Sequence, residues 1–175
     1  MIAQALHPFR RRRTLARLRQ GKRPVSILVV CHGNLCRSPY AAAALAARLA
    51  KAGVPIRVES AGFSTPDQAP PDAAVMAASK RGVHLEAHRS RTLSALLLAA
   101  HDMAIVVDPA MRRALQARGG VERVFVLGDF DPDRIASRAI RDPMGASADV
   151  FRTCYDRIDR CVAQLADALV SATAT

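Results

Sequence analysis

The chain has 175 residues, and half of them are hydrophobic, so it can form one domain with a substantial core, and disorder throughout is excluded. No apolar run approaches the length of about 18 residues that indicates a membrane span, and the N-terminus lacks the apolar middle of a signal peptide. Four cysteines are too few for the disulfide framework of a small secreted domain. We therefore expect a cytoplasmic protein with reduced thiols.

The net charge of +11 is unevenly distributed along the chain. Eight of the 26 Lys and Arg residues and none of the 15 acidic residues lie within residues 1–23, so the remainder carries a net charge of only +3. We predict a basic, flexible extension over residues 1–23 and one folded domain over residues 24–175. Residues 10–19 could form a short basic helix that contacts an acidic partner or an anionic membrane surface. Because only 4% of the residues are aromatic, specific nucleic-acid binding is not expected.

Strand patterns and helix patterns alternate in chain order. Short apolar runs predict four strands, at residues 25–30, 54–59, 103–107 and 121–127. Helical patterns lie between and after them, at residues 41–50, 72–80, 94–100, 110–118 and 148–169. This alternation is typical of an α/β protein. We predict a three-layer sandwich with a central four-stranded parallel sheet and helices on both faces.

Residues 31–39, with the sequence CHGNLCRSP, follow the first predicted strand directly and precede a helix. Ser38 and Pro39 fit the N-cap and the first position of that helix. In such a loop the backbone N–H groups and the positive end of the helix dipole face one hollow, which suits a phosphate-sized oxyanion. These dipoles, with Arg37, would favour the thiolate form of Cys31 at neutral pH. The planar Arg37 side chain can also bind two phosphate oxygens.

Two further residues suit the turn, since Gly33 allows a tight backbone and Asn34 tolerates a left-handed conformation. The pattern of a Cys, five residues and Arg-Ser, with Gly and Asn inside it, resembles the phosphate loop of the low-molecular-weight protein tyrosine phosphatases. The resemblance covers about residues 25–170, and it implies a phosphatase with Cys31 as nucleophile. Transfer to a thiolate requires no metal or cofactor. The loop residues expected to bind or support the substrate are His32, Gly33, Asn34, Leu35, Cys36, Arg37 and Ser38.

The same resemblance implies roles for residues that do not react with the substrate. Ser38 would donate a hydrogen bond to the thiolate, and Cys36 would form a reversible disulfide with Cys31 under oxidation. His88 and Arg91 resemble a His-x-x-Arg element that supports the fold near the phosphate loop. We expect a monomer whose partner is a tyrosine-phosphorylated protein substrate.

A thiolate can accept a phosphoryl group only if the departing oxygen is protonated, so a carboxylic acid is needed across the cleft. Candidates within residues 128–147 are Asp129, Asp131, Asp133 and Asp142. Asp142 is favoured because it lies just before the final predicted helix, in the position where the family keeps its general acid. Asp131, which is also followed by Pro, is the runner-up.

The segment 63–71 is a candidate wall of the cleft, because it follows a strand and should lie at the same sheet edge as the phosphate loop. Relatives often carry an aromatic residue in this segment and another after Asp-Pro, where this chain has Pro66, with Phe63 nearby, and Met144. Leu35 favours an aryl ester over phosphoarginine, since arginine-specific relatives tend to carry Thr there. We predict hydrolysis of phosphotyrosine in proteins through a phosphocysteine intermediate.

Three alternatives remain at this point. A protein phosphoarginine phosphatase would use the same loop. An arsenate reductase on the same scaffold would relay a disulfide to two further cysteines, but Cys154 and Cys161 lie in the final predicted helix, which is the wrong place for that relay. A non-catalytic phosphate-binding module would be expected to lose the nucleophile, the arginine or the acid, and this chain retains Cys31, Arg37 and Asp142.

Overall fold

The four predicted strands form one parallel sheet with the strand order β2-β1-β3-β4. A computed structural model describes residues 2–20, 22–119 and 121–171 of the chain. The central strand β1 pairs in parallel with β2 on one side and with β3 on the other, and β3 pairs with β4. The strands are β1 Ser26–Cys31, β2 Arg57–Gly62, β3 Met103–Val106 and β4 Arg123–Val126.

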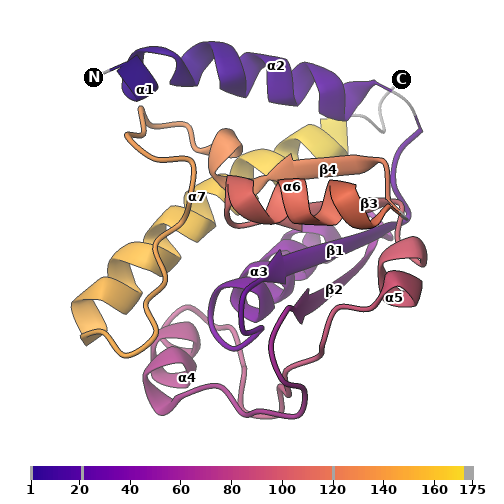
Figure 1. Ribbon diagram of the computed structural model, residues 1–175. Coiled ribbons are helices and arrows are strands. Elements are labelled where there is room, and N and C mark those ends of the chain that lie inside the picture. The colour runs from indigo at the N-terminus through magenta and orange to yellow at the C-terminus, as the bar shows by residue number, and fades with distance from the viewer. Residues whose placement is uncertain (1, 21, 120, 172–175) are drawn as a thin grey trace.

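Helices cover both faces of the sheet, which confirms the predicted three-layer sandwich (Figure 1). Helices α3, α4 and α7 contribute buried residues to the core on one face, and α5 and α6 contribute to the core on the other. The helices are α1 Ile2–Ala5, α2 His7–Arg19, α3 Arg37–Lys51, α4 Asp72–Ser79, α5 Ala95–Ala99, α6 Pro109–Arg118 and α7 Ala148–Ser171, with a 3₁₀ helix η1 at Leu127–Phe130.

The alternation of side chains along β1 places Cys31 on the α3 side of the sheet. Ile27, Val29 and Cys31 belong to the core beneath α3 and α7, whereas Leu28 and Val30 belong to the opposite core. All six residues of β1 are buried, as expected for a central parallel strand. Cys31 is the last residue of this strand, so it lies at the carboxyl edge of the sheet, where sites of open α/β proteins form.

Two element boundaries differ from the sequence prediction in a way that matters for the site. The helix predicted to have Ser38 as its N-cap and Pro39 as its first residue begins at Arg37, so α3 extends back into the phosphate loop. The second strand begins at Arg57 rather than at residue 54, because Val54 and Ile56 pack in the core without joining the sheet. β2 therefore ends at Gly62, beside the end of β1, and its last residues reach the phosphate loop.

The N-terminal segment departs furthest from the prediction of a flexible extension. Its described residues 2–19 form α1 and α2, and α2 packs along η1 and α7 (Figure 1). The charge pattern indicated a solvated segment, but His7, Thr14 and Leu18 lie on one face of α2 and are buried. His7 Nε2 contacts Asp131 O at 2.8 Å, and Leu18 joins the main core. Residues 1 and 21 of the predicted extension, and residues 120 and 172–175 of the predicted domain, lie outside the described residues.

A search of the described helices for a membrane span finds none that is both long and apolar enough to cross a bilayer.

Candidate active site

The loop between β1 and α3 turns at Asn34, which has a φ of +55° and therefore adopts the left-handed conformation expected of it. Its side-chain amide is fully engaged. Nδ2 donates to Ser38 Oγ at 2.9 Å and to Ser60 Oγ at 2.8 Å, and Oδ1 accepts from Arg91 N at 2.8 Å. Asn34 thus joins the phosphate loop to the end of β2 and to the segment that precedes α5.

The Cys31 sulfur lies among hydrogen-bond donors. Asn34 N donates to Sγ at 3.2 Å, and Ser38 Oγ lies 3.0 Å from Sγ. The Ser38 oxygen already accepts from the Asn34 side chain, so its own proton can be donated to the sulfur, which is nearer than the alternative acceptor Ala61 O at 3.4 Å. Two donors directed at one sulfur stabilise negative charge on it.

The structure corrects the prediction that Ser38 is the N-cap of the helix. The residue before α3 is Cys36, its side chain makes no capping hydrogen bond, and Ser38 and Pro39 lie within the first turn of the helix. The Ser38 hydroxyl is directed at Cys31 and Asn34 instead. The N-terminal N–H groups of α3 are therefore left for an anion in the hollow of the loop.

Residues outside the loop hold it in place, and some of them were not predicted from the sequence. A Cβ atom on Gly62 would lie 2.6 Å from His32 O, so β2 can approach the loop only with glycine there. Tyr155 in α7 donates to Cys36 O at 3.3 Å. His88, which was predicted to support the loop, contacts Asn34 O through Nε2 at 2.7 Å. Burial lowers the pKa of His88, although this hydrogen bond opposes the shift, so a neutral ring donates here.

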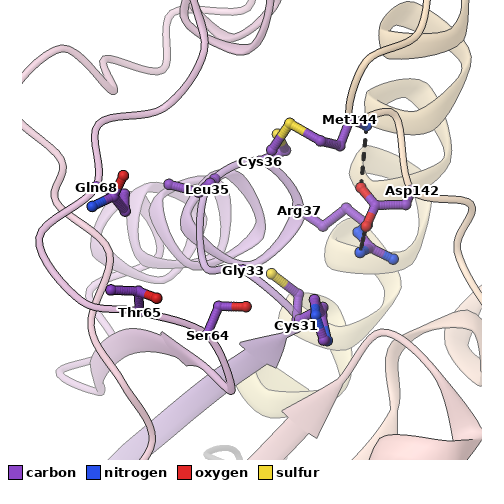
Figure 2. Close-up of a pocket in the computed structure, with 11 residues that line it drawn as sticks. Cys31, Gly33, Leu35, Cys36, Arg37, Ser64, Thr65, Gln68, Asp142 and Met144 are labelled. Atoms are coloured by element: carbon purple, nitrogen blue, oxygen red, sulfur yellow. Dashed lines mark hydrogen bonds and ion pairs between the residues drawn. The ribbon is translucent and has the colours of Figure 1, made fainter.

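A cavity of about 370 Å³ opens above the Cys31 sulfur. In Figure 2, Ser64, Thr65 and Gln68 lie on one side of it and Arg37, Asp142 and Met144 lie on the other. The cavity is lined by Cys31, His32, Gly33, Leu35, Cys36, Arg37, Ser64, Thr65, Gln68, Asp142 and Met144.

Most of the predicted site residues reach this cavity, with two differences. Asn34 and Ser38 do not line it, because both are fully buried behind the sulfur. The segment 63–71 forms a wall as expected, but Phe63 and Pro66 do not line the cavity. Phe63 packs against the core on the α5 and α6 face of the sheet, because side chains at the end of β2 alternate between the two faces.

Arg37 joins the phosphate loop to the segment that carries Asp142. Its side chain is buried, Nη1 donates to Ile140 O at 3.1 Å, and Nη2 forms an ion pair with Asp142 Oδ2 (Figure 2). Nε is also buried and has no hydrogen-bond partner among the described residues. The Asp142 side chain is 46% exposed, and Oδ1 accepts from Met144 N at 3.2 Å. A carboxylate at the cavity mouth and a guanidinium donor inside it are thus held together.

The other three aspartates of this region do not line the cavity. Asp131, the runner-up, is fully buried and forms ion pairs with Arg157 and Arg160 of α7. Asp129 is held by two hydrogen bonds from Arg138, and Asp133 is exposed and pairs with Arg160. The dipeptide Asp-Pro occurs at both residue 131 and residue 142, so the dipeptide alone could not show which of the two aspartates lines the cavity.

The remaining cysteines are held as thiols. Burial raises the pKa of Cys36 to about 12, and the charge of Asp142 adds to the shift. Burial likewise raises the pKa of Cys154 to about 12, and it raises that of Cys161 in the core of α7. Over the described residues, no group of three or more His, Cys, Asp or Glu side chains is placed to hold a metal ion.

A comparison with known protein families matches the chain from the first residue of β1 onward. A family model described as low molecular weight phosphotyrosine protein phosphatase matches residues 26–174. The chain belongs to this family. As a member of the low-molecular-weight phosphatases it is an enzyme of the phosphatase class, and its substrates are phosphorylated proteins.

Individual relatives of this low-molecular-weight phosphatase carry two kinds of name. The probable low molecular weight protein-tyrosine-phosphatase EpsP of Ralstonia nicotianae is 34% identical over 140 residues, which are 78% of this chain and 90% of the relative. A protein-arginine-phosphatase of Bacillus subtilis is 28% identical over 148 residues, which are 83% and 97% of the two chains. The solved structure of Vibrio vulnificus Wzb in complex with benzylphosphonate has a TM-score of 0.70 at 28% identity, covering 81% of this chain and 97% of that one.

Proposed function

We propose that this phosphatase hydrolyses phosphotyrosine in proteins through a phosphocysteine intermediate. The observation that carries the proposal is one cavity in which a cysteine sulfur with two donors lies close to a buried arginine and a carboxylate. Phosphoryl transfer requires a nucleophile, stabilisation of the equatorial oxygens and a proton for the leaving group. The sulfur, the arginine and the carboxyl group would meet these three requirements in turn.

In the first step the Cys31 thiolate attacks phosphorus in line with the ester oxygen. The bond from sulfur to phosphorus forms as the bond from phosphorus to the tyrosine oxygen breaks, and Asp142 gives its proton to that oxygen. The loop N–H groups and Arg37 stabilise the three equatorial oxygens. Arg37 has a donor to spare for this, because its Nε is buried without a hydrogen-bond partner in the described part of the chain.

In the second step a water molecule attacks the phosphocysteine. Asp142, now a carboxylate, takes a proton from that water, the bond between sulfur and phosphorus breaks, and inorganic phosphate leaves. The thiolate is a better leaving group when its charge is stabilised, and Ser38 Oγ at 3.0 Å and Asn34 N at 3.2 Å from the sulfur supply that stabilisation. Both are positioning residues, since they act on Cys31 and lie behind it.

The lining of the cavity favours tyrosine over arginine as the phosphorylated residue. Leu35 and Met144 present apolar surface to the cavity, which suits a phenyl ring. Among the described lining residues Asp142 is the one acid, and it pairs with Arg37, so the guanidinium of phosphoarginine would have no carboxylate of its own. The benzylphosphonate bound by the Vibrio vulnificus relative is likewise an aromatic ring with a phosphonate.

A phosphoarginine phosphatase is the second candidate, because the Bacillus subtilis relative carries that name. An arsenate reductase is disfavoured by the position of Cys161, which is fully buried in α7 and could not exchange disulfides with a donor protein. A non-catalytic phosphate-binding module is disfavoured by the donors around Cys31, since binding alone does not require a stabilised thiolate.

The experiment is a substrate panel of phosphotyrosine peptides, phosphoarginine peptides and an aryl phosphate, measured with wild type and Cys31→Ser. We expect kcat/KM for phosphotyrosine to exceed that for phosphoarginine by about tenfold or more, and Cys31→Ser to abolish turnover of all three. The reverse ranking would establish the arginine phosphatase. Equal rates for wild type and Cys31→Ser would leave only phosphate binding.

We also propose that Cys36 protects Cys31 from irreversible oxidation. Peroxide would oxidise Cys31 to a sulfenic acid, and the Cys36 thiol would condense with this acid to form a disulfide, with loss of water. A dithiol would then reduce the disulfide and restore both thiols. Cys36→Ser should then recover poorly after peroxide treatment, and full recovery would contradict this role.

A thiolate nucleophile requires a reducing compartment, so we propose that the enzyme is cytoplasmic. We also propose that it is a monomer.

A further inference from the structure

A second cavity, of about 440 Å³, lies between α2, α6 and the segment after η1. Helix α2 lies over this part of the molecule in Figure 1. None of the residues that line the second cavity lines the catalytic one. We call it the arginine pocket, since it is lined by Arg10, Arg13, Thr14, Arg17, Arg112, Asp129 and Arg138.

The side chains that line the arginine pocket carry more positive than negative charge. Five arginines line it, and Asp129 is the one acid among its described lining residues. That acid is already bound by Arg138, whose Nε and Nη2 donate to its two oxygens at 2.7 and 2.6 Å. Arg17 stacks over the Phe125 ring at 5.2 Å, and neither Arg13 nor Arg112 forms an ion pair in the described part of the chain.

Arg112 brings a buried, unused hydrogen-bond donor to the pocket. Its Nε is buried and has no hydrogen-bond partner among the described residues. Burial lowers the pKa of Arg112, and repulsion from Arg17 and Arg138 lowers it further, against the attraction of Asp129. A buried donor without an acceptor destabilises the folded protein, and a bound anion would supply the missing acceptor.

Three of the arginines that line the pocket lie outside the part of the chain that the family model matches. The family model begins at residue 26, whereas Arg10, Arg13 and Arg17 belong to α2. The docking of α2 on η1 and α7 is what brings these three side chains to Arg112 and Arg138. The pocket is therefore a feature of this chain and distinct from the phosphate loop.

We propose that the arginine pocket binds a small anion with two or more phosphate groups, of the oligophosphate class. A guanidinium presents paired N–H donors that match two phosphate oxygens. The guanidinium groups that line this cavity come from three separate segments, so an anion with several phosphate groups can engage more of them than a single phosphate can. The cavity volume lies within the range of small-ligand sites, which is about 300–1,000 Å³. Its concave form suits a compact soluble anion better than a flat membrane surface.

The test is calorimetric titration of inorganic tripolyphosphate into the full-length protein at an ionic strength of about 0.15 M, which screens exposed charges. Arg112→Gln and Arg13→Gln should each weaken binding about tenfold, because each removes a charge-assisted hydrogen-bonding group. Arg12→Gln is the matched control, since Arg12 is an exposed arginine of α2 that does not line the pocket. It should change the dissociation constant by less than about twofold.

Turnover of an aryl phosphate separates this site from the phosphate loop. Arg112→Gln and Arg13→Gln should leave kcat and KM unchanged in the absence of tripolyphosphate, and unchanged turnover also shows that the variants are folded. If Arg112→Gln proves unstable, exposed Arg13 supplies the same test. Absence of tripolyphosphate binding to wild type would overturn the proposal. Equal weakening by Arg12→Gln and by the two pocket variants would also overturn it, since binding would then follow net charge alone.

Discussion

The phosphate loop and the arginine pocket both concentrate positive potential, but they are built differently. The phosphate loop is one continuous stretch from Cys31, the last residue of β1, to Ser38 in the first turn of α3, and we expect its donors to be mainly backbone N–H groups with one buried arginine. The arginine pocket is assembled from α2, α6 and the segment after η1, and its donors are side chains. In the loop, the polar side chains Asn34 and Ser38 are held by one another. Each site nevertheless keeps a buried guanidinium donor with no partner among the described residues, Arg37 Nε in the loop and Arg112 Nε in the pocket.

The way each site is built determines which changes would abolish anion binding there. A site made of backbone donors is lost only when its loop or its reacting groups are changed, because the dipoles belong to the fold itself. A site made of side chains from distant segments is also lost when one segment moves away. Four substitutions test which contacts each region depends on.

Asp142→Ala should remove the chemistry of the first site and leave the second intact. We expect kcat for phenyl phosphate to fall about 100-fold to 1,000-fold, because the leaving oxygen would depart without a proton. The loss should be smaller for nitrophenyl phosphate, whose leaving group is more acidic. Steady-state kinetics on the two esters checks this. Asp133→Ala, which removes an exposed carboxylate from the same region, should change kcat by less than about twofold.

Asp131→Asn should act on stability rather than on chemistry. It would leave Arg157 and Arg160 without the carboxylate that both contact, and we expect the free energy of unfolding to fall by about 2–4 kcal/mol, because the carboxylate is fully buried and Arg160 partly exposed. Urea denaturation measures this. Asp133→Asn is the control and should change the free energy by less than about 0.5 kcal/mol. A variant of Asp131 that kept full stability but lost turnover would restore it as a candidate acid.

Ser38→Ala should show that the loop depends on its own internal contacts. We expect kcat to fall about tenfold with little change in KM, because the thiolate loses one donor and leaves phosphorus more slowly. A larger burst of phenol in pre-steady-state kinetics would place the loss in the second step. Ser60→Ala is the matched control, since Ser60 also accepts from Asn34 Nδ2. It makes no contact with the sulfur in the described structure, and an equal effect of both variants would contradict the role of Ser38.

His88→Gln should have the smallest effect of the four substitutions, a weaker dependence of the free energy of unfolding on pH. Burial lowers the pKa of His88 in the folded protein, so between that value and the unperturbed value near 6.5 the unfolded chain binds more protons. Stability from this group is therefore present above about pH 6.5 and is lost as the pH falls through the lowered pKa. Urea midpoints at about pH 7.5 and pH 5.5 should differ less in the variant, whose amide can still donate to Asn34 O. An unchanged difference would contradict this assignment.

Much of the first site could be predicted from local sequence. The alternation of strands and helices predicted the sheet, and Cys31, Gly33, Asn34 and Arg37 lie close enough in sequence for their spacing to define the loop. The same reasoning misplaced Ser38, because an N-cap and a donor to a neighbouring sulfur require the same residue type. It also missed Gly62, since the need for glycine there arises from the approach of His32 O across two strands.

The charge pattern of residues 1–23 was misleading for a related reason. Net charge predicts how a segment interacts with solvent when nothing covers it. It does not reveal that His7, Thr14 and Leu18 share one helix face, or that η1 and α7 present a surface to that face. The arginine pocket could therefore not be predicted, because it exists only once α2 has docked.

The succession of strands and helices along the chain and the anion-binding turn between β1 and α3 follow from local sequence, because both depend on hydrogen bonds and side-chain alternation among near neighbours. Only the packing of the layers brings Asp142, which its place before the final helix already favoured, to the cavity that Cys31 lines, and only this packing places the N-terminal helix. Arg37 and Asp142 are 105 positions apart, and His7 and Asp131 are 124 apart. Contacts over such separations depend on how whole layers pack, and two aspartates that each precede a proline can then have opposite environments, one fully buried and one partly exposed at the cavity.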